Sequence, residues 1–119
     1  MKYLMLIKAR ESYRSEPISQ GLIDAMDTFI SKGFESGILK DTAGLRPTNE
    51  SFAVRLKDGK LHITDGPFSE AKEVIGGYAV VETKTDAEAR QMARDFMELH
   101  RVHWPSFDGE CEVRPLDGQ

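Results

Sequence analysis

A carboxylate, Asp65, stands at the end of an apolar stretch, immediately before a glycine and a proline. Leu61 and Ile63 precede it at a spacing of two, so in an extended strand all three side chains point to the same side. If that side faces the core, the carboxylate lies at the edge of an apolar interior, where it must be paired, hydrogen-bonded or protonated. Asp65 is therefore the first candidate for a general acid or base.

Two interpretations of Asp65 follow from its neighbours. Apolar side chains such as Phe68 and Tyr78 would favour its protonated form and suit it to proton transfer. Alternatively, its carboxylate accepts backbone N–H bonds across Gly66, because Asp-Gly-Pro is a typical turn sequence. The sequence leaves both open.

Arg46 is a candidate for binding a substrate carboxylate. It precedes a proline, which holds its backbone extended, and a guanidinium suits a bidentate contact. The alternatives are an ion pair with Asp65 or a nearby glutamate, or solvent exposure. The other members of the predicted substrate-binding set are aromatic: Phe68, Tyr78 and Tyr13, which lies in the loop before the first helix.

His100 and His103 lie three residues apart near the end of a predicted helix, so they could share a face. A metal site needs further ligands, and the thiol of Cys111 at this spacing matches no zinc pattern well. Cations near a helix C-terminus also favour the helix dipole, which explains the pair without a metal. We therefore expect no metal and no cofactor.

The apolar periodicity predicts a β-α-β unit, a hairpin and a second β-α-β unit. Asp58-Gly59 is typical of a tight hairpin turn, and Thr85 with Glu88 forms a capping box that starts the second helix. Pro17 is expected to open the first helix, at about residues 17–34. The expected strands are 2–8, 38–48, 52–56, 61–64, 74–83 and 112–114.

This order predicts an α+β fold, ferredoxin-like βαββαβ with an inserted β-hairpin, in a single domain over residues 1–119. Both helices of such a fold cover one face of the sheet. Strands 2–8 and 74–83 are nevertheless apolar on both faces, and no third helix is available. A second copy of the chain is the expected cover, which makes the protein a homodimer.

The strand at 74–83 carries two apolar faces around a glycine pair. A regular strand would place Val74, Tyr78 and Val80 on one face and Ile75, Ala79 and Val81 on the other. Gly76-Gly77 lacks the sequence context of a phosphate loop and indicates a bulge or a close approach between strands.

Several short motifs, in this order, resemble those of the YCII-related family, whose members carry a DGPF signature. The matching segments are Gly44-Leu45-Arg46-Pro47, Asp65-Gly66-Pro67-Phe68 with Glu70, Lys72 and Glu73, Gly77-Tyr78, His103-Trp104-Pro105 and Glu112-Val113-Arg114-Pro115. The resemblance implies a dimeric α/β-barrel in which two ferredoxin-like sheets stack face to face.

The resemblance implies little about activity. The wider superfamily includes monooxygenases and isomerases, and some members of this branch lie near or are fused to sigma factors. Enzyme-like relatives carry a histidine on the first helix that pairs with an aspartate, whereas residues 17–34 contain no histidine. Of that pair only an aspartate, Asp65, is left as a candidate.

Composition excludes several classes of function. The chain has 119 residues, a net charge of −4 and one cysteine, so a basic nucleic-acid surface and a disulfide framework are not expected. The longest apolar run near the start, residues 3–7, is too short for a signal peptide or a membrane span. We expect a cytoplasmic protein that binds neither nucleic acid nor membrane.

Two functions remain open. The first is binding of a small, partly apolar organic molecule between helix and sheet, with cofactor-free acid/base catalysis by Asp65. The second is a non-catalytic regulatory or protein-interaction module, with a sigma factor as a possible partner. Whether the protein is an enzyme is left undecided.

Overall fold

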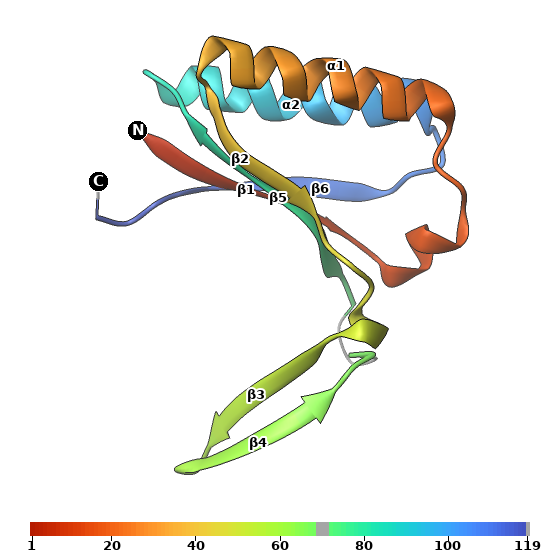
Figure 1. The fold of residues 1–119 in the computed structure, drawn as a ribbon, viewed down its shortest axis with the longest axis vertical. Helices are drawn as coiled ribbons and strands as arrows, with labels where there is room; N and C mark the ends of the chain where they lie inside the picture. Colours follow the sequence, from red (N-terminus) through yellow and green to blue (C-terminus); the bar gives the residue numbers. More distant parts are fainter. Residues whose placement is uncertain (69–71, 119) are drawn as a thin grey trace.

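The computed structural model describes residues 1–68 and 72–118. Glu70, part of the motif noted above, lies outside the described residues. A four-stranded antiparallel sheet, two long helices and a separate hairpin make up the chain (Figure 1). The elements are β1 (Lys2–Ala9), η1 (Glu11–Ser15), α1 (Gln20–Ser36), β2 (Leu39–Gly44), η2 (Thr48–Glu50), β3 (Phe52–Lys57), β4 (Lys60–Asp65), β5 (Val74–Glu82), α2 (Asp86–His103) and β6 (Gly109–Pro115).

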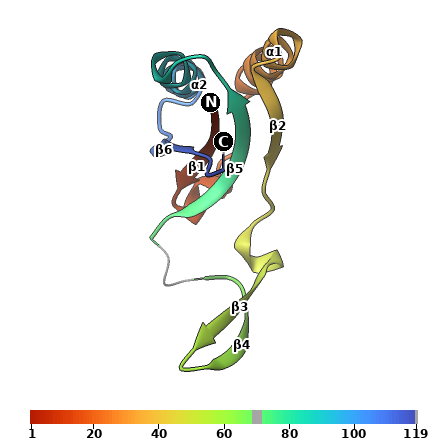
Figure 2. The same ribbon diagram turned by 90° about the vertical axis from the view of Figure 1, so that its left-hand side faces the viewer.

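The sheet has the strand order β2-β5-β1-β6, and every neighbouring pair in it is antiparallel. The hairpin β3-β4 is inserted between β2 and β5 and forms a sheet of its own. Both helices lie over the same face of the four-stranded sheet, and the hairpin projects away from it (Figure 2). The predicted ferredoxin-like α+β fold with an inserted hairpin is confirmed.

The core lies between the helices and the sheet. Alternate residues of β1 point toward the helices, and Met5 is paired there with Ala79 of β5 and Val113 of β6. Burying such a side chain contributes roughly 1.5–3 kcal/mol, so this face supplies most of the stability of the domain. The buried core cluster consists of Tyr3, Met5, Leu39, Val81, Ala89 and Ala93.

Helix α1 begins later than Pro17. The Ser19 side chain accepts a hydrogen bond from the Leu22 N–H at 3.2 Å and caps the helix, which leaves Pro17 in the preceding loop. The prediction was wrong here because a serine cap satisfies the first amides, which a proline cannot do. Gly37 ends the helix with φ at 80°, as expected of a glycine C-cap.

Helix α2 starts as the capping box predicted. The Thr85 hydroxyl accepts a hydrogen bond from the Glu88 N–H at 3.2 Å, and the Glu88 carboxylate accepts one from the Lys84 N–H at 3.4 Å. The helix ends at His103, two residues before Pro105.

A β-bulge changes the faces predicted for β5. The register between β1 and β5 shifts so that Ile7 is opposite Gly77 and Lys8 is opposite Ile75, which leaves Gly76 as the extra residue. Val74 is consequently buried on the helix side, and Ile75 is 42% exposed on the other side. The predicted bulge is therefore confirmed, whereas the faces predicted for Val74 and Ile75 are wrong, because the bulge inverts the alternation.

The side of the sheet that faces away from the helices is partly apolar. Leu4, Leu6 and Val80 lie on it, half-buried, flanked by the charged groups of Lys8 and Glu112, which lie 3.2 Å apart. No described element of the chain packs on this side in the two ribbon views.

The hairpin carries an exposed apolar face. The side chains on it are paired across the strands and are 57–73% exposed. One interpretation of Asp65 assumed that Leu61 and Ile63 face the core. Both side chains are instead exposed and do not face the core of their own chain. A two-stranded hairpin with one apolar face is marginal by itself in water. The members of this apolar hairpin face are Phe52, Val54, Leu56, Leu61 and Ile63.

The base of the hairpin is closed by contacts between segments that the sequence separates. The Gly66 N–H donates to the Ser51 carbonyl oxygen at 2.8 Å. A Cβ at position 66 would lie 1.7 Å from the Thr48 carbonyl oxygen, so only glycine fits. Glu11 accepts hydrogen bonds from both the backbone and the hydroxyl of Thr48, which ties η1 to this base and lowers the pKa of the Glu11 carboxyl.

Gly66→Ala is expected to lower the free energy of unfolding by about 1–3 kcal/mol, because the added methyl collides with backbone that has no rotamer to change. Gly44→Ala is the matched control, since a Cβ there meets nothing within 4 Å, and it should change stability by less than about 0.5 kcal/mol. Urea unfolding measures both. Equal effects of the two substitutions would contradict the close approach at Gly66.

Candidate functional site

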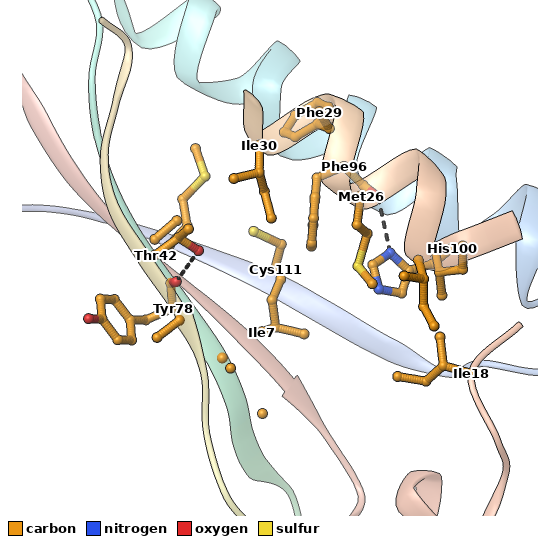
Figure 3. Close-up of a pocket in the computed structure, with 18 of the residues that line it drawn as sticks. Ile7, Ile18, Met26, Phe29, Ile30, Thr42, Tyr78, Phe96, His100 and Cys111 are labelled. Carbon is orange, nitrogen blue, oxygen red and sulfur yellow. Dashed lines mark hydrogen bonds between the residues drawn. The ribbon is translucent and has the colours of Figure 1, made fainter. Parts of the chain in front are cut away.

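A cavity of about 330 Å³ lies between the two helices and the sheet. Most of its lining is apolar and comes from α1, α2, β1, β2, β5 and β6 (Figure 3). Ile18 and Ile23, which are 44% and 37% exposed, line it together with the exposed Gly44, so its mouth lies between the start of α1 and the edge strand β2. Ligand pockets start at about this volume.

The bulge and the glycines shape one wall of this cavity. Gly76 and Gly77 both line it, and a Cβ at Gly76 would lie 2.6 Å from the Tyr13 hydroxyl. The glycine therefore lets the Tyr13 ring approach β5. Burial raises the pKa of the Tyr13 phenol, which keeps it neutral and a hydrogen-bond donor.

His100 is the most distinctive polar group in the lining. Only 7% of its surface is exposed, and its ring packs between Phe96 and Phe107, with both ring centroids 5.0 Å away. Nδ1 lies 3.1 Å from the Phe96 carbonyl oxygen (Figure 3). Because a carbonyl oxygen can only accept, Nδ1 carries the proton and Nε2 is the bare nitrogen.

Burial lowers the pKa of His100 below its ordinary value of 6.5, so the ring is neutral at pH 7. Within the part of the chain that the structure describes, no group donates a hydrogen bond to Nε2. Among the described residues, the lining thus has one basic nitrogen acceptor, set in mostly apolar surroundings.

Two further polar groups in the lining, those of Cys111 and Thr42, are unreactive or already paired. Burial raises the pKa of the Cys111 thiol to about 11, so the reactive thiolate does not form at neutral pH. The Thr42 hydroxyl donates to the Tyr78 carbonyl oxygen at 2.8 Å. Asp27 is exposed on α1, at the mouth.

An aromatic cluster closes the end of the cavity near His100. Tyr13, Trp104 and Phe107 have ring centroids 5.0–6.3 Å apart. The orientation of Trp104 is set by its indole N–H, which donates to a Glu16 carboxylate oxygen at 2.8 Å. The same oxygen accepts from the Ser106 hydroxyl at 3.0 Å. Trp104 itself lines the cavity.

Only part of the predicted site lies at this cavity. Tyr13 and Tyr78 line it, whereas Asp65, Arg46 and Phe68 do not. Arg46 pairs with Glu50 at 3.0 Å, which was one of its predicted alternatives. Among the residues that the structure describes, none donates a hydrogen bond to the exposed Asp65 carboxylate, and its catalytic role stays a prediction.

The hydroxyl of Tyr78 points away from the cavity. It donates to Asp41 at 2.9 Å on the opposite side of the sheet, and this bond raises the pKa of the phenol. Figure 3 shows the ring directed away from His100 and Cys111. Tyr78 therefore contributes its backbone and the start of its side chain to the lining, but not its donor group.

Sequence reasoning missed His100 as a member of this site. The signal was its position, because Ala89, Ala93, Phe96 and His100 recur at spacings of four, three and four. Such a spacing places the histidine on the buried stripe of α2 rather than beside the exposed His103. In residues 1–68 and 72–118, no three His, Cys, Asp or Glu side chains are grouped so as to hold a metal ion.

An antiparallel sheet covered on one face by two helices, with a cavity between the layers, defines a ferredoxin-like α+β domain. A sequence profile of the YCII-related domain matches residues 1–98, and the chain belongs to this family. The matched residues include the DGPF segment and most of α2, but not Trp104 or β6.

A protein of Rhizobium meliloti (strain 1021), described as uncharacterised, is 36% identical to this chain over 85 residues. The alignment spans 71% of this chain and 64% of that relative, so the relative extends well beyond the matched part. Among the described helices, none is both long and apolar enough to cross a membrane.

The lowered pKa of His100 predicts a pH dependence of stability. As the pH falls below 6.5 the unfolded chain takes up a proton that the buried ring resists, so the melting temperature should fall in this range. The pKa values of Glu11 and Glu98 are also lowered, but they affect stability only below about pH 4.5. Thermal melts between pH 5 and 7 test this.

His100→Leu should remove the decrease in melting temperature between pH 7 and 5, because the buried titrating group is gone. His62→Gln, on the exposed hairpin, should retain it. A decrease that persists in His100→Leu would show that another group causes it.

Proposed function

We propose that this YCII-related protein binds a small, uncharged, largely apolar organic molecule in the cavity between its helices and its sheet. The observation that carries this proposal is a cavity of about 330 Å³ that is lined by apolar and aromatic side chains and has one unpaired nitrogen. A core that served only stability would be packed without such a space, because voids weaken a protein.

The lining argues for an uncharged ligand. Among the described residues that line the cavity there is no lysine or arginine to pair with an anion, and the one carboxylate, Asp27, lies at the exposed mouth. A charged group inside would lose its hydration without a partner. Arg46, the predicted partner of a substrate carboxylate, is 81% exposed at the side chain and pairs with Glu50.

Catalysis by Asp65 would need this carboxylate to reach a ligand. Asp65 lies at the end of β4, at the base of the hairpin, and is not part of the lining. The basic nitrogen inside the cavity is that of His100. The proposal therefore assigns binding to the cavity and leaves Asp65 catalysis as a separate hypothesis.

Toluene, a neutral probe of suitable size, should bind the wild-type protein saturably. Trp104 is the only tryptophan of the chain and lines the cavity, so its fluorescence reports occupancy. Cys111→Leu fills the space and should weaken binding at least about tenfold, whereas Cys111→Ala enlarges it and should not. Ile7→Phe, from the neighbouring strand, is a second variant that fills the space.

Absence of saturable binding to the wild type would refute a ligand-binding cavity. Asp65→Asn in the same titration tests the separate hypothesis. Unchanged binding and unchanged turnover of any substrate later found would exclude Asp65 as an acid or base.

Homodimer formation is the second part of the proposal. Two apolar surfaces have no cover within the described chain: the outer side of the sheet, with Leu4, Leu6 and Val80, and the apolar hairpin face. A chain of this size does not usually expose two such surfaces, and a second copy covers both at once. The hairpin has three basic and two acidic residues and so a small positive net charge, whereas the whole chain carries −4. The charge of the hairpin is therefore complementary to that of the rest of a second copy.

A regulatory or protein-interaction module remains the alternative function. The observation that favours it is the same hairpin, whose five apolar side chains would suit a protein partner as well as a second copy. A sigma factor is one such partner. The oligomeric state distinguishes the two, because a dimer that uses the hairpin has no apolar hairpin face left to offer.

Sedimentation at micromolar concentration should show a dimer. Leu6→Lys, on the outer side of the sheet, and Ile63→Lys, on the hairpin, should each shift the protein toward monomer, because a charge is placed in an apolar interface. Ser31→Lys, on the exposed side of α1, is the control and should remain dimeric.

A wild-type monomer would contradict the dimer. A dimer that is lost in Leu6→Lys but kept in Ile63→Lys would assign the sheet to the dimer and leave the hairpin to another protein.

A further inference from the structure

We propose that the cavity selects ring compounds that carry one hydroxyl or N–H donor, such as phenols or indoles, and binds that donor at Nε2 of His100. This inference rests on the proposed function and adds the chemical class of the ligand. It depends on which ring nitrogen carries the proton, and the structure decides that.

The backbone of α2 holds the histidine in one tautomer. The Phe96 carbonyl oxygen, one helical turn before His100, accepts from Nδ1 at 3.1 Å. A carbonyl oxygen can only accept, so the proton of the neutral ring must be on Nδ1. Nε2 is therefore the acceptor of a neutral imidazole. No fully buried side-chain nitrogen or oxygen of the described residues lacks a partner, so the unpaired Nε2 is accessible from the cavity, where a donor of a ligand can reach it.

The walls on both sides of the ring suit a flat ligand. Phe96 and Phe107 pack against His100 at centroid distances of 5.0 Å, and Phe29 packs against Phe96 at 5.6 Å. Met26, on α1, also lines the cavity, and its thioether adapts to aromatic rings. A ring lodged among these side chains gains edge-to-face and sulfur contacts that a branched aliphatic ligand does not.

Nε2 of His100 is the strongest uncharged acceptor among the described side chains that line the cavity. The Thr42 hydroxyl already donates to the Tyr78 carbonyl oxygen, and the Cys111 thiol is a weak donor and acceptor. The Tyr13 hydroxyl, near Gly76, can both donate and accept, but a phenol oxygen is a weaker acceptor than a neutral imidazole nitrogen. The Asp27 carboxylate is an acceptor, but it is exposed at the mouth, where water satisfies it.

The test compares phenol with toluene, which has nearly the same shape and no donor. Their absolute affinities also differ in hydrophobicity, so the informative quantity is the change in the phenol-to-toluene affinity ratio between wild type and His100→Leu. We expect this ratio to fall about tenfold in His100→Leu, since a buried hydrogen bond to a specific acceptor is lost. Calorimetric or fluorescence titration measures all four affinities.

Phe96→Leu is the matched control, because it removes an aromatic contact while its backbone carbonyl still accepts from His100. This substitution should lower the affinities for phenol and toluene by similar factors and leave the phenol-to-toluene affinity ratio unchanged. Nitrogen NMR of the imidazole gives an independent readout, in which the His100 signal is assigned by its absence in His100→Leu. We expect a proton on Nδ1 and a shift of the Nε2 signal when phenol is added.

The outcomes separate this inference from the proposed function. Toluene binding with an unchanged ratio in His100→Leu, or a proton on Nε2 in the wild type, would overturn the role of His100 and leave the cavity intact. Failure of both probes to bind the wild type would overturn the proposed function itself. Once the pH falls below the lowered pKa of His100, phenol should lose more affinity than toluene, because a protonated imidazole has no acceptor.

Discussion

Two helices can cover only one face of a four-stranded sheet, and most of this structure follows from that constraint. The face under α1 and α2 holds the core, with Met5 at its centre. The other face keeps Leu4, Leu6 and Val80 without a cover from the described chain. Because the inserted hairpin projects away instead of folding back, it adds a second apolar surface rather than covering the first.

The same two layers leave a space where they do not meet. A bulge at Gly76 lets Tyr13 approach β5, and the aromatic residues at the end of α2 close the cavity at that side. Residues from seven elements contribute to it: β1, η1, α1, β2, β5, α2 and β6. The cavity is therefore a property of how the layers are spaced, and its one basic nitrogen, on His100, owes its availability to a backbone carbonyl one helical turn away.

The glycine of the DGPF motif is explained by the packing at the base of the hairpin rather than by acid/base chemistry. Gly66 is required because the Thr48 carbonyl oxygen occupies the place of a side chain, and its amide is bonded to Ser51. The motif thus closes the base of the hairpin. Its aspartate, at the end of β4, lies away from the cavity, so the most recognisable segment of the sequence and the most chemically suitable site are in different places.

The sequence by itself determined the elements and their order, because alternation, capping and turn residues are local: the hairpin at Asp58-Gly59 and the cap at Thr85 lie where they were predicted. It also contained the periodicity that buries His100, although the three-residue spacing to His103 equally allowed the two histidines to share a face. Only the tertiary structure decided that β3-β4 stands apart, that a bulge inverts Val74 and Ile75, and that His100 meets the cavity. These depend on contacts between residues far apart in the chain, and no local pattern specifies such contacts.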